Sequence, residues 1–344
     1  MTAPLSATAV ETPPAKREVI VRVDDRVRLA SAILAATNYP DKSQERKKHG
    51  THAHARGTRK VVGEFTSHPA VHAMQVLLEQ NTPLNAIYSY LLRLTWPNLE
   101  PTEEPPRWVP PRWHEYLRHF YEQTNLEKWW ADEAPQWQTP VRHLRESFAK
   151  IDMYAFFRPF VGEVVETLVF MPNVSYPSDQ TLGFRVGGEL VTIMPPPIAW
   201  GDSPPWPYKD DPALAYRAAL NEYATLLMSA YLRQHGSVIQ AISDKPLAID
   251  EKYAESHGNW ISQFMGIFRA AITVLFLEDS VSLLEAKSFI MHMQKVEHLT
   301  ALPGIVNVMR RYLEDYRTGK YAQFADYLPN FPKHLRVAKT IAAL

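Results

Sequence analysis

The strongest constraint on the fold of this chain is a change of sequence periodicity near its middle. Residues 161–174 and 181–195 are typical of strands, whereas the apolar residues on both sides of them recur at helical spacing. Gly187 and Gly188 interrupt the second run and predict a tight turn, so that this run folds back as a hairpin. The sequence therefore predicts an α+β protein that is mostly helical, with a small antiparallel β-sheet.

Helical periodicity and proline content divide the rest of the chain. Proline-rich connections at 96–113 and 195–212 exclude regular elements there. Helices are predicted at 68–81, 83–96, 113–133, 139–156, 213–235, 259–277, 280–295 and 303–317. The predicted organisation is a flexible arm at 1–17 and one domain at 18–344, made of a mainly helical half (18–160), a hairpin region (161–200) and a second helical half (213–344).

The composition excludes several classes of protein. The chain has 344 residues, 46% of them hydrophobic, which is enough for a sizeable core. Lys and Arg together number 37, as do Asp and Glu, so no overall charge attracts nucleic acid or an anionic membrane. The absence of cysteine excludes disulfides, thiolate metal sites and a cysteine nucleophile. Neither a signal peptide nor a membrane span is expected, and the predicted location is the cytoplasm.

The stretch "ALNEYATLLMSAYL" (219–232) places a glutamate, Glu222, inside an apolar helix. Four polar residues at a spacing of four form one stripe beside it: Arg217, Asn221, Thr225 and Ser229. Histidines at the second and third of these positions would make the His-Glu-x-x-His pattern of zinc hydrolases, in which the glutamate activates a metal-bound water. The alternative is an amphipathic helix whose polar stripe faces solvent.

The order of several segments resembles an uncharacterised bacterial family of predicted zincin-type metalloproteases. The resemblance extends over roughly residues 20–335, and no single match in it is specific. The segments that carry it are "EFTSHPAV" (64–71), the hairpin at 161–195, "NEYAT" (221–225), "WISQFMGIFRAAITVLF" (260–276) and "YAQFADYLP" (321–329). The resemblance implies a zincin-like architecture. It also implies that Asn221, Thr225 and Met265 stand where the family has its zinc ligands, and that Glu222 is the retained general base.

These departures from the family pattern predict the loss of zinc chemistry. Asn and Thr offer neutral oxygens that bind Zn²⁺ weakly, and a Met thioether suits softer ions. The expected protein is a degenerate, non-catalytic metalloprotease that needs no cofactor and binds another protein or a peptide. The vacated cleft could hold a peptide by edge pairing with the strand at 181–195.

Two alternatives remain at this stage. The first is an active metallohydrolase with other ligands around Glu222, for which His235 and His257 with Glu251 or Glu255 are candidates. The second is a nucleic-acid-associated protein that uses the basic loop at 46–60, in which clustered cations could contact phosphates. The cations of this loop are Arg46, Lys47, Lys48, Arg56, Arg59 and Lys60.

A last expectation concerns the charge of Glu222. A buried carboxylate without its metal needs a cation, hydrogen bonds or a proton. Arg269 lies in the apolar run 260–277 and needs a partner as well. The sequence therefore predicts that the helices at 213–235 and 259–277 pack together and that Glu222 pairs with Arg269.

Overall fold

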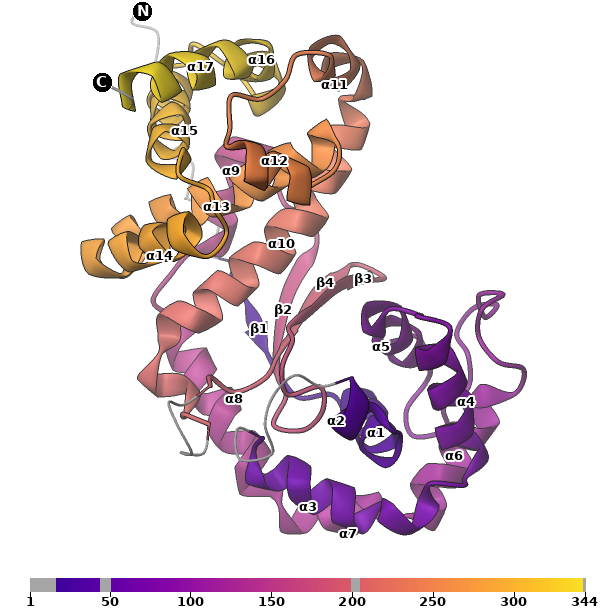
Figure 1. Ribbon diagram of the computed structural model, residues 1–344. Helices are drawn as coiled ribbons and strands as arrows, with labels where there is room; N and C mark the ends of the chain where they lie inside the picture. The colour runs from indigo at the N-terminus through magenta and orange to yellow at the C-terminus, as the bar shows by residue number, and fades with distance from the viewer. Residues whose placement is uncertain (1–16, 44–50, 199–204, 343–344) are drawn as a thin grey trace, which may run out of the picture.

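The computed structural model describes residues 17–43, 51–198 and 205–342, and in it a central sheet lies between two groups of helices (Figure 1). In chain order the strands are β1 (Ile20–Val21), β2 (Thr167–Pro172), β3 (Leu182–Val186) and β4 (Glu189–Met194). Helices account for most of the remaining described residues. The predicted α+β class with a mostly helical chain is confirmed.

The helices fall before and after the β3–β4 hairpin. Those before it are α1 (Asp25–Ala36), α2 (Tyr39–Lys42), α3 (Ala53–Val61), α4 (Pro69–Glu79), α5 (Leu84–Leu92), α6 (Trp113–Gln123), α7 (Leu126–Asp132), α8 (Ala134–Phe148) and α9 (Met153–Val161). Those after it are α10 (Pro212–Gln234), α11 (Gly236–Ser243), α12 (Glu251–Ser256), α13 (Trp260–Ser280), α14 (Leu283–Lys295), α15 (Leu302–Arg317), α16 (Phe324–Tyr327) and α17 (Phe331–Ala342).

Two of the predicted helices are each divided in the structure. The segment 113–133 forms α6 and α7, separated at Asn125, which has a φ of 49° in the left-handed region that asparagine tolerates. The segment 139–156 forms the end of α8 and the start of α9, because the Asp152 carboxylate caps α9 by accepting from the Ala155 amide at 2.9 Å. Hydrophobic periodicity continues through both breaks, so it did not reveal them.

The sheet is mixed rather than antiparallel, which corrects the prediction. Its strand order is β1-β2-β4-β3. The hairpin predicted at Gly187-Gly188 is present, and β3 and β4 pair antiparallel. However, β4 returns into the middle of the sheet and pairs parallel with β2, and β1 pairs parallel with the other side of β2. Strand β3 is therefore an edge of the sheet.

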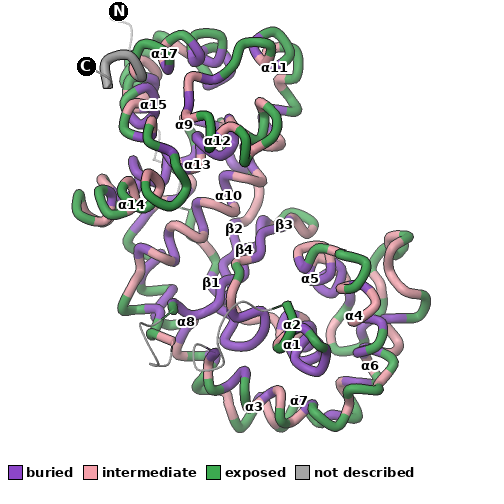
Figure 2. Tube along the Cα trace, in the orientation of Figure 1, coloured by how far each residue is buried: buried purple, intermediate pink, exposed green. Residues whose placement is uncertain are grey.

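The two faces of the sheet belong to two different cores. Val169 of β2 and Val191 of β4 pack into a cluster formed mainly with helices α1–α7. Their neighbours Leu168 and Leu190 point the other way, into a cluster formed with helices α8–α17. This alternation is the period-2 pattern of a strand that is buried on both faces. Figure 2 shows the buried strands between the two groups of helices.

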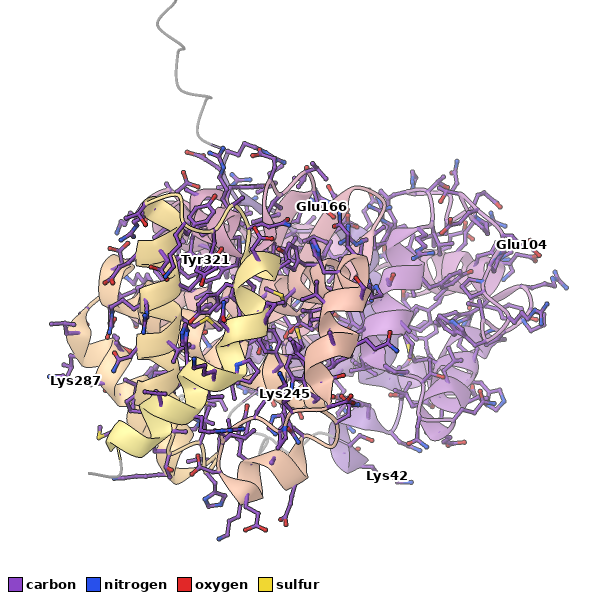
Figure 3. The ribbon with its side chains drawn as sticks, turned by 90° about the horizontal axis from the view of Figure 1, so that it is seen from above. Lys42, Glu104, Glu166, Lys245, Lys287 and Tyr321 are labelled. Atoms are coloured by element: carbon purple, nitrogen blue, oxygen red, sulfur yellow. The ribbon has the colours of Figure 1, made fainter. Side chains whose placement is uncertain are left out.

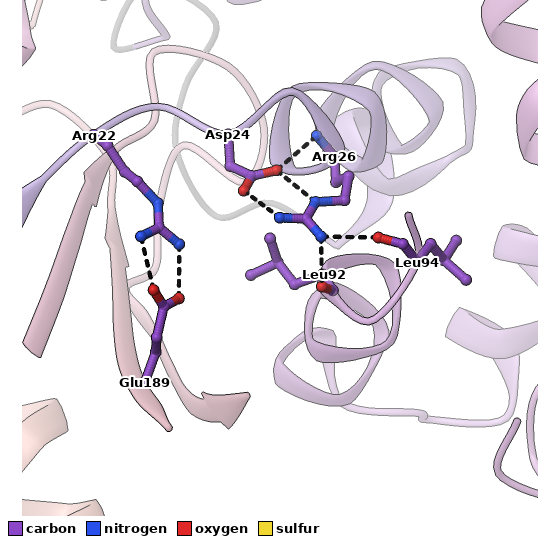
Figure 4. Close-up of polar contacts among 6 residues, drawn as sticks. All are labelled: Arg22, Asp24, Arg26, Leu92, Leu94 and Glu189. Atoms are coloured by element: carbon purple, nitrogen blue, oxygen red, sulfur yellow. Dashed lines mark hydrogen bonds and ion pairs between the residues drawn. The ribbon is translucent and has the colours of Figure 1, made fainter. Parts of the chain in front are cut away.

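Two arginines, one just after β1 and one in α1, form an ion pair and hydrogen bonds with distant parts of the fold (Figure 4). Arg22 forms a two-pronged ion pair with Glu189 at the start of β4, at 2.8 and 2.6 Å. Arg26 of α1 donates to the carbonyls of Leu92 and Leu94 at 2.8 Å each, and Asp24 holds its guanidinium from the other side. Figure 3, seen from above, shows charged side chains such as Lys42 and Lys287 at the outer surface.

The predicted flexible arm at 1–17 lies outside the described residues, except for Arg17, which is part of the fold. Its guanidinium donates to the carbonyl of Glu166 at 2.9 Å and lies over the ring of Tyr154, 4.2 Å from its centroid. The strand-like alternation that starts at Glu18 did not reveal this anchor.

Helices α10 and α13 form the centre of the second helical group. Asp211 caps α10 through the Leu214 amide, and Pro212 occupies its first turn, as the sequence predicts. Helix α13 is long and apolar enough to cross a membrane by length and composition, with a mean hydropathy of 1.6. However, 78% of the most apolar 18-residue segment of α13 is buried inside the fold, as in the core helix of a soluble protein.

Candidate functional site

Glu222 lies on the side of α10 that faces the edge strand β3. A Cβ atom added to Gly183 of β3 would come within 2.6 Å of the Glu222 Cβ and 2.8 Å of its carboxylate carbon. The glutamate therefore lies directly against the backbone of the strand, which is possible only because residue 183 has no side chain. Gly183 was not among the predicted site residues, although a glycine inside a strand pattern indicates such a close approach.

The protonation of Glu222 is shifted by its surroundings. Burial raises the pKa of the Glu222 carboxyl, and this effect dominates. A hydrogen bond from Asn221 and the positive charge of Arg269 oppose it. The Asn221 amide donates to Glu222 Oε1 at 2.8 Å. The carboxyl thus holds its proton to a higher pH than an exposed glutamate does.

The guanidinium of Arg269 lies among the three positions that the resemblance assigns to zinc ligands. Its Nη1 donates to Asn221 Oδ1 at 2.9 Å and to Thr225 Oγ1 at 3.4 Å. Its Nε donates to the carbonyl of Met265 at 3.3 Å. We call these four residues the Arg269 cluster. Residues from two helices thus meet at one fixed positive charge.

The predicted pair of Glu222 and Arg269 is indirect. The helices at 213–235 and 259–277 do pack together, as α10 and α13. In the described part of the chain, however, no ion pair joins the two side chains, and Asn221 bridges them by accepting from Arg269 and donating to Glu222. Neighbouring residues on a helix point about 100° apart, so Asn221 faces α13 while Glu222 faces β3.

The polar stripe of α10 is neither fully exposed nor fully buried. Its members Arg217, Asn221, Thr225 and Ser229 are all half-buried. A cavity of about 540 Å³ adjoins the stripe, between α10, α12, α13 and α14. We call it the α10–α14 cavity. Its polar lining includes Arg217, Asn221, Tyr253, His257, Arg269 and Glu297.

The histidines of the first alternative do not gather into a metal site. His257 is held by its own helix, with Nδ1 2.8 Å from the Tyr253 carbonyl and its ring stacked on the Tyr253 ring. The ring of His235 lies against that of Tyr231, with centroids 4.4 Å apart. Within residues 17–43, 51–198 and 205–342, no group of three or more His, Asp or Glu side chains is placed to hold a metal ion.

The predicted basic loop at 46–60 is partly helical. Arg46, Lys47 and Lys48 lie outside the described residues, whereas Arg56, Arg59 and Lys60 belong to α3. Helix α3 begins at Ala53 because the His52 side chain caps it, accepting from the His54 amide at 3.1 Å.

The described cations and histidines of this segment have structural contacts. The Arg56 guanidinium donates to the carbonyl of Thr51, and Arg59 pairs with Asp41, donating at 3.0 Å. His54 is buried and accepts from the Trp137 indole at 3.0 Å, and burial lowers its pKa to about 3. Lys60 is exposed, and it is the one described cation of the segment that makes no hydrogen bond or ion pair with the described residues.

Comparisons of the chain with protein-family models, curated proteins and solved structures give no match. The assignment to a zincin-type family therefore stays a prediction from the order of sequence segments. The Arg269 cluster, the edge strand β3 and the α10–α14 cavity are the features of the structure that bear on function.

Proposed function

We propose that this protein is a non-catalytic binding protein, derived from a zincin-type metalloprotease, that works in the cytoplasm. The observation that carries the proposal is the contact of the Arg269 guanidinium with the side chains of Asn221 and Thr225 and with the backbone carbonyl of Met265. These are the three positions at which the family resemblance expects ligands. A guanidinium among them supplies a permanent positive charge where a zinc enzyme needs a dication.

The residues present do not fit a zinc ion. The oxygens of Asn221 and Thr225 already accept from the Arg269 guanidinium, and they are neutral and weak ligands for Zn²⁺. The Arg269 guanidinium stays protonated at any physiological pH, so its positive charge would repel a dication beside it. Glu222 then has no metal-bound water to deprotonate, so hydrolysis of the zincin type is not expected.

The edge strand β3 supports a peptide as the bound partner. The Asn85 side chain of α5 donates to the Gly183 carbonyl at 2.9 Å, so this carbonyl points away from β4. Arg185 lies two residues further along the strand, and its backbone groups point to the same side. Arg185 and Val186 are partly exposed. An extended segment of a partner protein could pair with this end of the strand.

The experiment is a matched pair of substitutions at Arg185. Arg185→Pro removes the outward backbone N–H, whereas Arg185→Ala removes the same side chain, including its ion pair with Glu166, but keeps that N–H. Peptides selected from a display library against the parent protein are the probes. We expect Arg185→Pro to lose binding by about tenfold or more, and Arg185→Ala to bind within about twofold of the parent.

Two results would contradict the proposal. The first is equal binding of the selected peptides to both variants, which would show that β3 is not part of the binding site. The other is peptide hydrolysis that depends on added zinc and is lost in Glu222→Gln, which would make the protein an enzyme of the kind that the first alternative describes.

A further inference from the structure

The α10–α14 cavity is separate from the edge strand and has its own chemistry. Its volume of about 540 Å³ lies within the range of about 300–1,000 Å³ that is usual for small-molecule sites. None of its lining residues comes from β3. The cavity is therefore a second candidate site, distinct from the β3 edge.

Arg217 is the residue of the cavity wall that most clearly indicates an anion-binding site. It lies one helical turn before Asn221 on α10, and its side chain is only 27% exposed. Its Nε is buried and has no hydrogen-bond partner among the described residues. The nearest carboxylate oxygen, from Asp211, is 3.9 Å from Nη2, which is too long for a hydrogen bond. No acceptor in the described residues lies within hydrogen-bond distance of the Arg217 guanidinium, and its partly exposed end lines the cavity, where it can donate to a bound anion.

A second cation and a hydroxyl face the same space. The Arg269 guanidinium is oriented by Asn221 and Thr225, so it is preorganised toward the cavity. Tyr253 lies against Gly266, where a Cβ would clash with its hydroxyl. Burial raises the pKa of Tyr253 to about 12, so its hydroxyl stays a hydrogen-bond donor at neutral pH.

The rest of the lining sets the charge and the shape of a ligand. Glu297 is the one carboxylate among the described lining residues, so with the lining histidines His257 and His292 counted as neutral the two arginines leave a net charge of one positive unit in the cavity. Apolar side chains cover another part of the wall: Leu214 of α10, Ala270 of α13, and Phe289 and Met293 of α14. Such a site matches a molecule with one negative group and a hydrocarbon body.

We propose that the α10–α14 cavity binds a small organic monocarboxylate, with its carboxylate between Arg217 and Arg269 and its apolar body against Phe289 and Met293. An arginine fork pairs with a carboxylate through two parallel hydrogen bonds, which accounts for arginine rather than lysine at both positions.

Isothermal titration of the full chain with 3-phenylpropionate, 3-phenylpropionamide and phenyl phosphate tests the proposal. The carboxylate should bind at micromolar to low millimolar Kd, and the isosteric amide should bind about tenfold or more weakly, because it lacks the charge. Failure of the carboxylate to bind, or equal binding of the amide, overturns the proposal. Tighter binding of the phosphate overturns the assignment to a carboxylate.

Variants locate the binding event. Arg217→Gln should weaken carboxylate binding by about tenfold or more, whereas Arg233→Gln, at an exposed position on the same helix, should leave it unchanged. Met293→Glu adds a negative charge to the cavity wall without touching either arginine, and should abolish binding even if Arg217→Gln does not fold. Unchanged affinity in Met293→Glu overturns the location. Arg185→Pro should bind the carboxylate normally, which separates this site from the β3 edge.

Discussion

At the scale of single residues, the site is organised by a cation rather than by the acid. The sequence singles out Glu222 as the unusual group, but the structure places Arg269 at the centre of the polar contacts and Glu222 to one side of them. Among the described residues, Asn221 alone joins the carboxylate to this network. Glu222 is therefore a half-buried acid whose desolvation outweighs the hydrogen bond from Asn221 and the charge of Arg269, so that its ionisation opposes folding.

The pH dependence of a Glu222→Gln variant follows from this. The folded-state pKa of Glu222 is raised above its ordinary value of 4.5, so the folded state holds the proton more tightly than the unfolded state. The protonated Glu222 carboxyl therefore stabilises the folded state at low pH relative to high pH. This stability is lost as the pH rises through the folded-state pKa. Glutamine does not ionise, so the stability of Glu222→Gln relative to the parent should increase as the pH rises above 4.5, the ordinary pKa of the carboxyl.

Denaturant melts of the parent and of Glu222→Gln at several pH values measure this difference. All other titrating groups are common to the two proteins, so the difference isolates Glu222. A difference that stays constant, or that falls as pH rises, would show that the carboxyl is not destabilised by burial.

At the scale of secondary-structure elements, helix α10 and strand β3 meet without a side chain between them. Gly183→Ala inserts a methyl group against Glu222, and overpacking of this kind costs about 1–3 kcal/mol. Gly188→Ala is the matched control, because a Cβ there meets nothing within 4 Å and its φ is not positive. We expect the control to change the free energy of unfolding by less than about 0.5 kcal/mol.

A double-mutant cycle with Glu222→Ala tests the cause. The cost of Gly183→Ala should be smaller when the carboxylate is absent, because part of the clash is with that group. Equal costs in both backgrounds would mean that the strand is constrained by something other than Glu222.

The elements themselves were predictable where the signal is local. Gly187-Gly188 specified the hairpin, and Asp211 with Pro212 specified the start of α10. The parallel pairing of β2 with β4 was not predictable, because it depends on residues outside the hairpin and on how the chain crosses the sheet. Helix α3 was missed because its capping histidine, His52, looked like one member of a basic loop.

The candidate site was only partly predictable for a similar reason. The spacing of Asn221 and Thr225 placed both on one face of a helix, and Arg269 was recognised as a charge that needs a partner. Which face of α10 meets which neighbour is a tertiary property. The contact of Glu222 with Gly183, and the meeting of Arg217 and Tyr253 at one cavity, join segments far apart in the sequence.

At the scale of the whole molecule, one sheet is shared by two cores, so the two groups of helices should unfold together. Leu190 and Val191 are neighbours on β4 that point into opposite clusters. Leu190→Ala should cost about 2–5 kcal/mol, and Val191→Ala somewhat less, since it removes fewer buried atoms. Both should lower the midpoint of a single thermal transition, followed by circular dichroism and by tryptophan fluorescence. Two transitions, each sensitive to one substitution, would instead indicate two independent folding units.

The central claim is that Arg269, and not a metal ion, holds the Arg269 cluster together. Metal analysis of the purified protein, combined with thermal melts with and without a strong chelator, tests it most directly. We expect far less than one zinc per chain and an unchanged melting temperature, because a protein without a structural ion has no metal-binding energy to lose. Stoichiometric zinc that survives dialysis, with a chelator-induced fall of several degrees that zinc reverses, would contradict the account.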